Sequence, residues 1–169
     1  YFIRQKLGTD LLDAPGGAEI GIRKDRLVCD VEEFKRLARD LQPEAAMSWY
    51  RGDLLPGFYL DDAVEFERWL ETERIALRRM ASSCCWELAE LKAAEEDPVS
   101  AGAWARRAAS YTPYDEAALH RLIQFLDDLG DRAGALRAYE HFASRLADEY
   151  AAEPSPETAA LVDQVRSRA

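Results

Sequence analysis

The chain has 169 residues, of which 48% are hydrophobic and 32% are charged. This length suits one folded domain with a small appendage, and the apolar fraction excludes an intrinsically disordered chain. The formal net charge is −10, so most of the surface is expected to repel the phosphate backbone of a nucleic acid.

The negative charge is unevenly distributed along the chain. Residues 1–40 carry eight Lys/Arg and eight Asp/Glu, so the acidic excess lies entirely in residues 41–169. Any contact with nucleic acid is therefore expected from the N-terminal end. Two interpretations of the acidic body stay open: it keeps the protein soluble, or it meets a basic protein surface.

Cysteine usage and hydropathy indicate a cytoplasmic protein without a membrane segment. The chain has three cysteines, Cys29, Cys84 and Cys85. An odd number with two adjacent residues does not suit a disulfide framework. No signal peptide is visible, and no stretch reaches the roughly 18 apolar residues of a membrane helix. The chain begins at Tyr1 without a methionine, which indicates a fragment of a longer protein.

The N-terminal segment predicts a short helix followed by a β-hairpin. Apolar residues within residues 1–7 recur near helical spacing, and Gly8 is typical of a helix end. Two β-prone runs, around residues 11–12 and 19–22, flank the turn sequence at residues 14–17.

The rest of the chain predicts helices only, separated by prolines and glycines. The expected helices cover residues 30–41, 44–50, 62–96, 99–111, 114–129, 132–150 and 156–168. Asp30 is expected to cap the first of them. The loop at residues 51–59 is apolar, which favours packing against the domain.

The chain also matches itself at an offset of 34 residues. Leu88 falls on Leu122 and Ala101 falls on Ala135, and a period of 34 is that of the tetratricopeptide repeat. A small residue at the alanine position suits the point where two helices cross most tightly. The pattern predicts an array of helical hairpins with a concave surface for a peptide or helix. A generic helical bundle is the alternative.

Aromatic and arginine side chains are the usual anchors of protein interfaces. The candidate residues of the protein-binding groove are therefore Trp104, Tyr111, Arg121, Tyr139 and Tyr150.

The sequence favours binding over catalysis. His120 and His141 both lie within helical patterns, where a seam or surface position explains them better than acid–base chemistry. The Cys84-Cys85 pair has no ligand spacing for zinc and suits a helix core. We expect no catalytic residues, no metal and no cofactor.

A basic cluster occupies the N-terminal segment. Arg4 and Lys6 fall on the expected helix and Arg23 and Lys24 on the hairpin, and Arg26 belongs to the same segment. Such residues suit phosphate contacts, with ordinary surface charge as the alternative.

Several motifs resemble the bacterial transcriptional activator domain, a module of SARP-type antibiotic regulatory activators and their relatives. The similarity covers about residues 30–165 and is carried by Arg51-Gly52-Asp53-Leu54-Leu55-Pro56-Gly57, Trp69, Glu73-Arg74, Pro113-Tyr114-Asp115-Glu116, Leu129-Gly130-Asp131, Ala135-Leu136, Tyr139 and Glu153-Pro154-Ser155-Pro156-Glu157-Thr158. The resemblance implies a tetratricopeptide-like domain at residues 29–169.

Residues 1–28 resemble the end of a winged-helix DNA-binding domain: the tail of a recognition helix, then the wing. The resemblance implies that Arg4, Lys6, Arg23 and Lys24 contact promoter DNA in the complete protein. The earlier elements of such a domain are absent, so we expect weak or no DNA binding by this chain alone.

The function implied by the resemblance is that of an interaction and oligomerisation module of a transcriptional regulator. Its partner would be RNA polymerase or a second copy of the chain in a homodimer. The alternative is a tetratricopeptide-type scaffold or adaptor with no role in DNA binding.

Overall fold

The computed structural model describes residues 11–13, 21–23 and 26–168, and most of this range is helical. Its strands are β1 (Leu12–Asp13) and β2 (Gly21–Ile22), and its helices are α2 (Asp30–Arg39), α3 (Pro43–Trp49), α4 (Val64–Ala94), α5 (Pro98–Ser110), α6 (Glu116–Asp128), α7 (Arg132–Tyr150) and α8 (Pro156–Ser167). The all-α architecture expected from the sequence is confirmed. The helix expected over residues 1–7 lies outside the described residues.

The N-terminal strands form the predicted hairpin. They pair antiparallel, with Leu12 opposite Ile22. Arg23 extends the ladder by donating its backbone N–H to the carbonyl of Leu11 at 2.9 Å. The turn expected at residues 14–17 lies outside the described residues.

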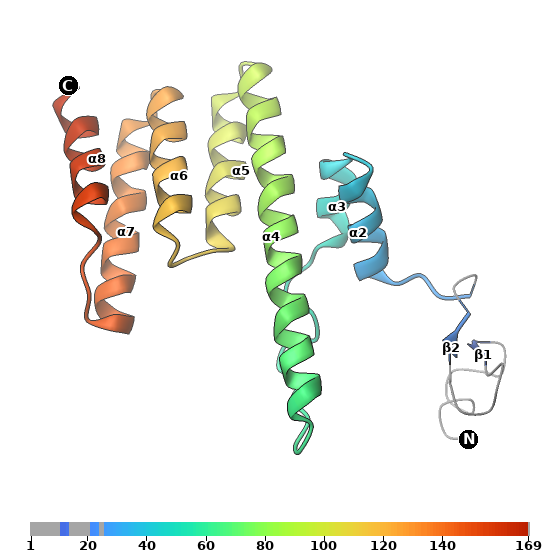
Figure 1. Ribbon diagram of the computed structural model, residues 1–169. Coiled ribbons are helices and arrows are strands. Elements are labelled where there is room, and N and C mark those ends of the chain that lie inside the picture. Colours follow the sequence, from blue (N-terminus) through green and yellow to red (C-terminus); the bar gives the residue numbers. More distant parts are fainter. Residues whose placement is uncertain (1–10, 14–20, 24–25, 169) are drawn as a thin grey trace.

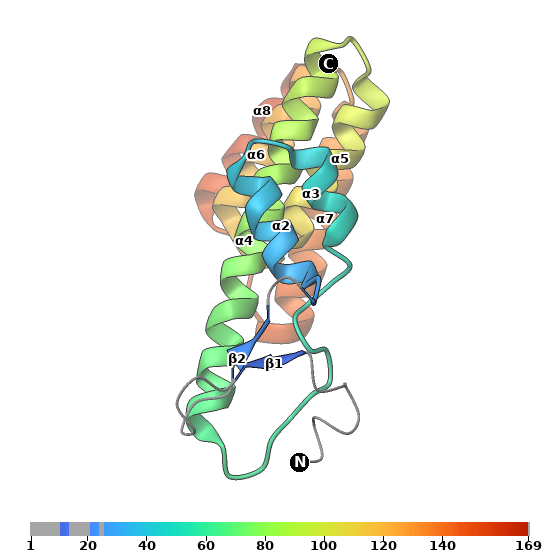
Figure 2. The ribbon, with the colours of Figure 1, turned by 90° about the vertical axis from the view of Figure 1, so that its right-hand side faces the viewer.

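Helices α2 to α7 form three successive hairpins, α2–α3, α4–α5 and α6–α7, and α8 follows the last (Figure 1). Neighbouring hairpins pack on one another through α3 and α4 and through α5 and α6, and α8 packs on both α6 and α7. The result is a row of helices that Figure 2 shows from its end. None of the described helices combines the length and the apolar composition needed to cross a membrane.

The turns inside the three hairpins share one hydrogen-bond pattern. Leu41, Glu96 and Gly130 follow their helices with positive φ values of 55°, 59° and 79°. In each turn the next residue donates its backbone N–H to the carbonyl five positions earlier, at 2.8 to 3.0 Å. This arrangement satisfies carbonyls that a helix end otherwise leaves unpaired. Since Glu96 and Gly130 lie 34 positions apart, the repeated geometry matches the repeat seen in the sequence.

A buried alanine follows each of these turns. Ala46, Ala101 and Ala135 come five positions after the residue with positive φ, and none of them has exposed surface. A methyl group at this point lets the two helices of a hairpin approach closely. The structure thus confirms the role predicted for Ala101 and Ala135 and adds Ala46 as the equivalent residue of the first hairpin.

Aromatic contacts join the hairpins into one core. The ring of Tyr50 at the end of α3 lies 5.1 Å from Phe34 of α2 and 5.5 Å from Tyr111 at the end of α5. Trp86 of α4 meets Phe125 of α6 edge to face at 5.6 Å. These contacts connect helices that are distant in sequence.

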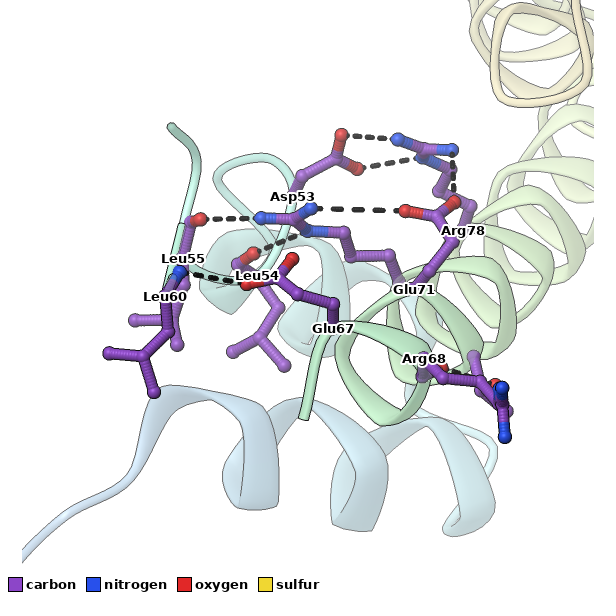
Figure 3. Close-up of polar contacts among 10 residues, drawn as sticks. Asp53, Leu54, Leu55, Leu60, Glu67, Arg68, Glu71 and Arg78 are labelled. Atoms are coloured by element: carbon purple, nitrogen blue, oxygen red, sulfur yellow. Dashed lines mark hydrogen bonds and ion pairs between the residues drawn. The ribbon is translucent and has the colours of Figure 1, made fainter. Parts of the chain in front are cut away.

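Two arginines of α4 hold the loop between α3 and α4 (Figure 3). Arg74 donates to the backbone carbonyls of Leu54 at 2.8 Å and Leu55 at 2.6 Å. Arg78 binds both carboxylate oxygens of Asp53, at 2.8 and 2.5 Å. The loop is therefore tied to the helix by polar contacts.

The apolar side chains of this loop pack less than the sequence suggests. Leu54 packs against the core, but Leu55, Phe58, Tyr59 and Leu60 are exposed. The expectation that the loop of residues 51–59 packs on the domain therefore holds for Leu54 and is wrong for Leu55, Phe58 and Tyr59. At this end α4 extends well beyond the other described helices (Figure 1), and α2 borders only the first part of the loop, residues 52–56.

The prediction that Asp30 caps α2 is also wrong. Cys29 is the N-cap of α2 and makes no side-chain cap hydrogen bond, and Asp30 is the first helical residue. The Asp30 carboxylate instead accepts from the N–H of Val31 at 2.8 Å, and its charge still favours the helix N-terminus.

Candidate functional site

A groove lies between α5 and α7, over the start of α6. Its volume is about 620 Å³. Arg106 and Ala109 of α5 lie on one wall, Gly134 and Ala138 of α7 on the other, and Leu119 of α6 on the floor. Because α5 and α7 are the equivalent second helices of two successive hairpins, α6 pairs with both and leaves a channel between them.

Small residues keep the groove open. Ala109, Gly134 and Ala138 line it at positions where larger side chains would fill the space between the helices. A Cβ atom on Gly134 would come within 2.5 Å of the side chains of Asp131 and Arg106. A side chain at this position would therefore have to displace the Arg106–Asp131 ion pair.

Arginines form the rim of the groove. Arg137 and Arg145 of α7 are exposed, and so is Arg106 on the α5 side. Arg106 forms an ion pair with Asp131, and the guanidinium of Arg137 lies 3.9 Å from the same carboxylate. Arg145 donates to the backbone carbonyl of Pro113 at 3.0 Å.

Two aspartates next to the groove are engaged with the protein itself. Burial raises the pKa of the Asp131 carboxyl, but hydrogen bonds from the Gly134 N–H and from Arg106 outweigh it and lower the pKa below its usual range. Asp115 caps α6 by accepting from the N–H groups of Ala117 and Ala118. Both carboxylates are thus held by helix N-termini, where the backbone already balances part of their charge.

The residues predicted to line a binding groove do not line this one. Tyr111 packs its ring on Tyr50, and its hydroxyl accepts from Arg107 at 3.1 Å. The guanidinium of Arg107 also lies 5.3 Å from the ring centre of Trp104. Tyr111 and Trp104 therefore share one surface on α5.

The other three predicted residues lie in separate environments. Arg121 of α6 lies over the ring of Trp86 at 4.0 Å, and Tyr139 of α7 is half-buried against the core. Tyr150 ends α7 and meets Tyr114 edge to face at 5.1 Å. The structure does not bring the five residues together, and their role in binding stays a prediction.

The groove residues that sequence reasoning missed have a recognisable spacing. Gly134, Ala138, His141 and Arg145 recur every three or four positions along α7, and so share one face of that helix. This face combines small and basic residues, whereas the search in the sequence was for aromatic anchors.

The residues predicted to contact DNA are mostly beyond the described part of the chain. Arg4, Lys6 and Lys24 lie outside it. Arg23 is exposed directly after β2. Their predicted role stays untested.

A cluster of polar residues at the start of α8 has a structural explanation. Ser155 is the N-cap of α8, and its hydroxyl donates to Glu116 of α6 at 2.5 Å. The hydroxyl of Thr158, which has no exposed surface, donates to the same carboxylate and lies 2.6 Å from Nε2 of His120. These bonds join α6 to α8, in agreement with a seam position for His120.

The described residues show no group of three or more side chains that could hold a metal ion. Cys84 and Cys85 are buried in α4, as expected for core residues.

Comparison with known families places the chain in a regulatory family. The model of the family described as the bacterial transcriptional activator domain matches residues 29–166. No curated protein and no solved structure shows significant similarity to the chain.

Proposed function

Because the chain belongs to the bacterial transcriptional activator domain family, we propose that its helical part acts by protein–protein contact within a transcriptional regulator. This family is a regulatory family and not an enzyme family. Its description relates the chain to transcriptional activation. The contact partner in this proposal is RNA polymerase or a second copy of the chain.

The groove between α5 and α7 is the observation that carries this proposal. It is open, lies on a row of stacked hairpins and is bordered by exposed arginines. Arginine is enriched in protein interfaces because its guanidinium forms several directed hydrogen bonds. Stacked helical repeats commonly use such a surface to hold a peptide or a helix.

In this proposal DNA recognition belongs to the N-terminal side of the chain. A complete winged helix would place the regulator on a promoter, and the helical part would then present its groove to the partner. The alternative is a scaffold without a DNA role. It would present the same groove to a partner, but no winged helix would place it on a promoter.

Purified components test the contact directly. Binding of the chain to RNA polymerase holoenzyme is measured by biolayer interferometry, and self-association is measured by sedimentation velocity. The groove variant R137E/R145E changes two exposed arginines, and R79E/R166E is the matched control on α4 and α8. We expect one of the two contacts in the wild type, its loss in the groove variant and its retention in the control.

Two outcomes would contradict the proposed role of the groove. If the wild type neither binds polymerase nor self-associates, the proposal fails and the scaffold alternative leads. If both double variants retain the contact, another surface carries it.

A further inference from the structure

We propose that the groove between α5 and α7 binds an acidic peptide segment of its partner, an inference that rests on the proposed function of protein contact through this groove. The occupant is identified by charge and by the spacing of the arginines.

The local charge of the groove is opposite to that of the chain. The chain carries a net charge of −10, yet Arg106, Arg137 and Arg145 line the groove against a single acidic lining residue, Asp115. The carboxylate of Asp115 is already used to cap α6. A basic site kept within an acidic surface favours a negatively charged ligand over a neutral one.

Arg137 and Arg145 are exposed, and their contacts within the protein leave part of each guanidinium open to a ligand. Arg106 forms an ion pair with Asp131, and Arg137 forms a longer ion pair with the same carboxylate, at 3.9 Å, with its side chain 61% exposed. Among the described residues no carboxylate lies within ion-pair distance of Arg145, which donates to the carbonyl of Pro113. Both guanidinium groups can therefore donate charge-assisted hydrogen bonds to a carboxylate.

The spacing along α7 fits a peptide. Arg137 and Arg145 are eight residues apart on one helical face, which separates them by about 12 Å. His141 lies between them and also lines the groove. Acidic residues four apart in an extended peptide span about 13 Å, so one short segment can reach both arginines.

The lining of the groove exposes more apolar than polar surface. Leu119, Leu122 and Phe142 are largely buried in it, and Ala109 and Ala138 add small side chains. We expect apolar side chains of the ligand to pack on this lining, while its acidic side chains bind the arginines and set the selectivity for charge.

Selection from a phage-displayed library of random 12-residue peptides tests the occupant. The library is selected on the wild-type chain, and retained phage are then tested on R137Q/R145Q and on the control R79Q/R166Q. Both double variants replace exposed arginines with a neutral side chain, and circular dichroism checks that both remain folded.

We expect the selected peptides to be enriched in Asp and Glu. These peptides are then synthesised with a fluorescein label, and they should bind the wild type and the control with equal affinity. Their affinity for R137Q/R145Q should be at least about tenfold lower, because two charge-assisted contacts are lost. Replacing their acidic residues by Gln or Lys should weaken binding to the wild type to a similar degree.

Three results would overturn the inference: no enrichment at all, enrichment of neutral or basic peptides, or equal binding to both variants. A labelled single-stranded oligonucleotide that binds as tightly through the same arginines would assign the groove to nucleic acid instead. The proposed function is judged separately by the polymerase and self-association measurements. Loss of those contacts in the groove variant, without a preference for acidic peptides, would reject only the inference.

Discussion

The loop before α4 depends on single side chains of that helix. Arg78 binds the Asp53 carboxylate through two hydrogen bonds, and Glu71 lies 3.8 Å from Arg78. The hydrogen bond from Arg78 lowers the pKa of the Asp53 carboxyl below its usual range, against a smaller opposing effect of burial. A lowered carboxyl pKa stabilises the folded chain above about pH 3.9, and this contribution is lost as pH falls through the folded pKa.

Replacing Arg78 by methionine should therefore destabilise the chain in a pH-dependent way. We expect R78M to lower the free energy of unfolding by about 1 kcal/mol at pH 7, because the ion pair is partly exposed. The difference from the wild type should shrink at about pH 3 as Asp53 becomes protonated. Urea denaturation at both pH values measures it, with R79M as the control for an exposed arginine. Equal stability of R78M and R79M at pH 7 would contradict the account.

The three cysteines should differ in reactivity. Burial raises the pKa of the thiols of Cys84 and Cys85 to about 11, whereas Cys29 is exposed at the start of α2. Since the thiolate is the reactive form, the native chain should take up one iodoacetamide label at pH 7.5, and the urea-unfolded chain three.

Mass spectrometry counts the labels in the native and unfolded chains. The variant C29S should remain unlabelled until it unfolds. Rapid labelling at a second native site would show that α4 does not protect its cysteines.

At the scale of elements, the three hairpin turns differ in how well their residues suit a left-handed backbone. Gly130 adopts positive φ without a steric cost, but Leu41 and Glu96 carry side chains in the same conformation. A non-glycine residue pays about 1–2 kcal/mol at such a position.

Exchanging glycine at two equivalent turns should change stability in opposite directions. We expect E96G to raise the free energy of unfolding by about 1 kcal/mol, and G130A to lower it by a similar amount. A Cβ atom at Gly130 would meet nothing within 4 Å, so only the backbone conformation is at issue. Urea denaturation of the two variants checks this, and shifts of the same sign would exclude the explanation.

The sequence predicted the helices and the last two hairpins, because prolines, glycines and apolar spacing are local signals. It did not predict that α2–α3 is an equivalent hairpin. Leu41 lies 55 positions before Glu96, since α4 is extended at its N-terminal end, and this insertion breaks the period of 34. Leu41 also lacks the glycine signal of a left-handed turn.

The candidate binding residues were harder to predict, for a physical reason. Aromatic residues anchor interfaces and cores alike, and here Tyr111 and Tyr150 use their rings on neighbouring tyrosines. The groove instead depends on the distance between α5 and α7, which no local pattern encodes. Arg137 and Arg145 can be recognised as groove residues only when that distance is known.

For the whole molecule, the charge distribution predicts weak binding to DNA. The acidic excess lies in residues 41–169, while the basic residues expected to touch phosphates lie in the N-terminal 28. We expect the chain to show little affinity for promoter duplexes. A chain that carries a complete winged helix upstream should bind, with affinity falling steeply as salt rises.

Fluorescence anisotropy at several salt concentrations compares the two chains. Binding by the longer chain alone would support a regulator whose helical part is an interaction module. If neither chain binds, the scaffold without a DNA role becomes the better explanation.

The most direct test of the central claim is a transcription assay with the chain tethered to a promoter. The full chain is fused to an unrelated DNA-binding domain whose operator precedes a reporter gene in bacteria. If the groove between α5 and α7 carries protein contact in activation, the wild type and R79E/R166E should raise transcription, and R137E/R145E should not. Activation by R137E/R145E at the wild-type level, with all fusions present in equal amounts, would contradict the account.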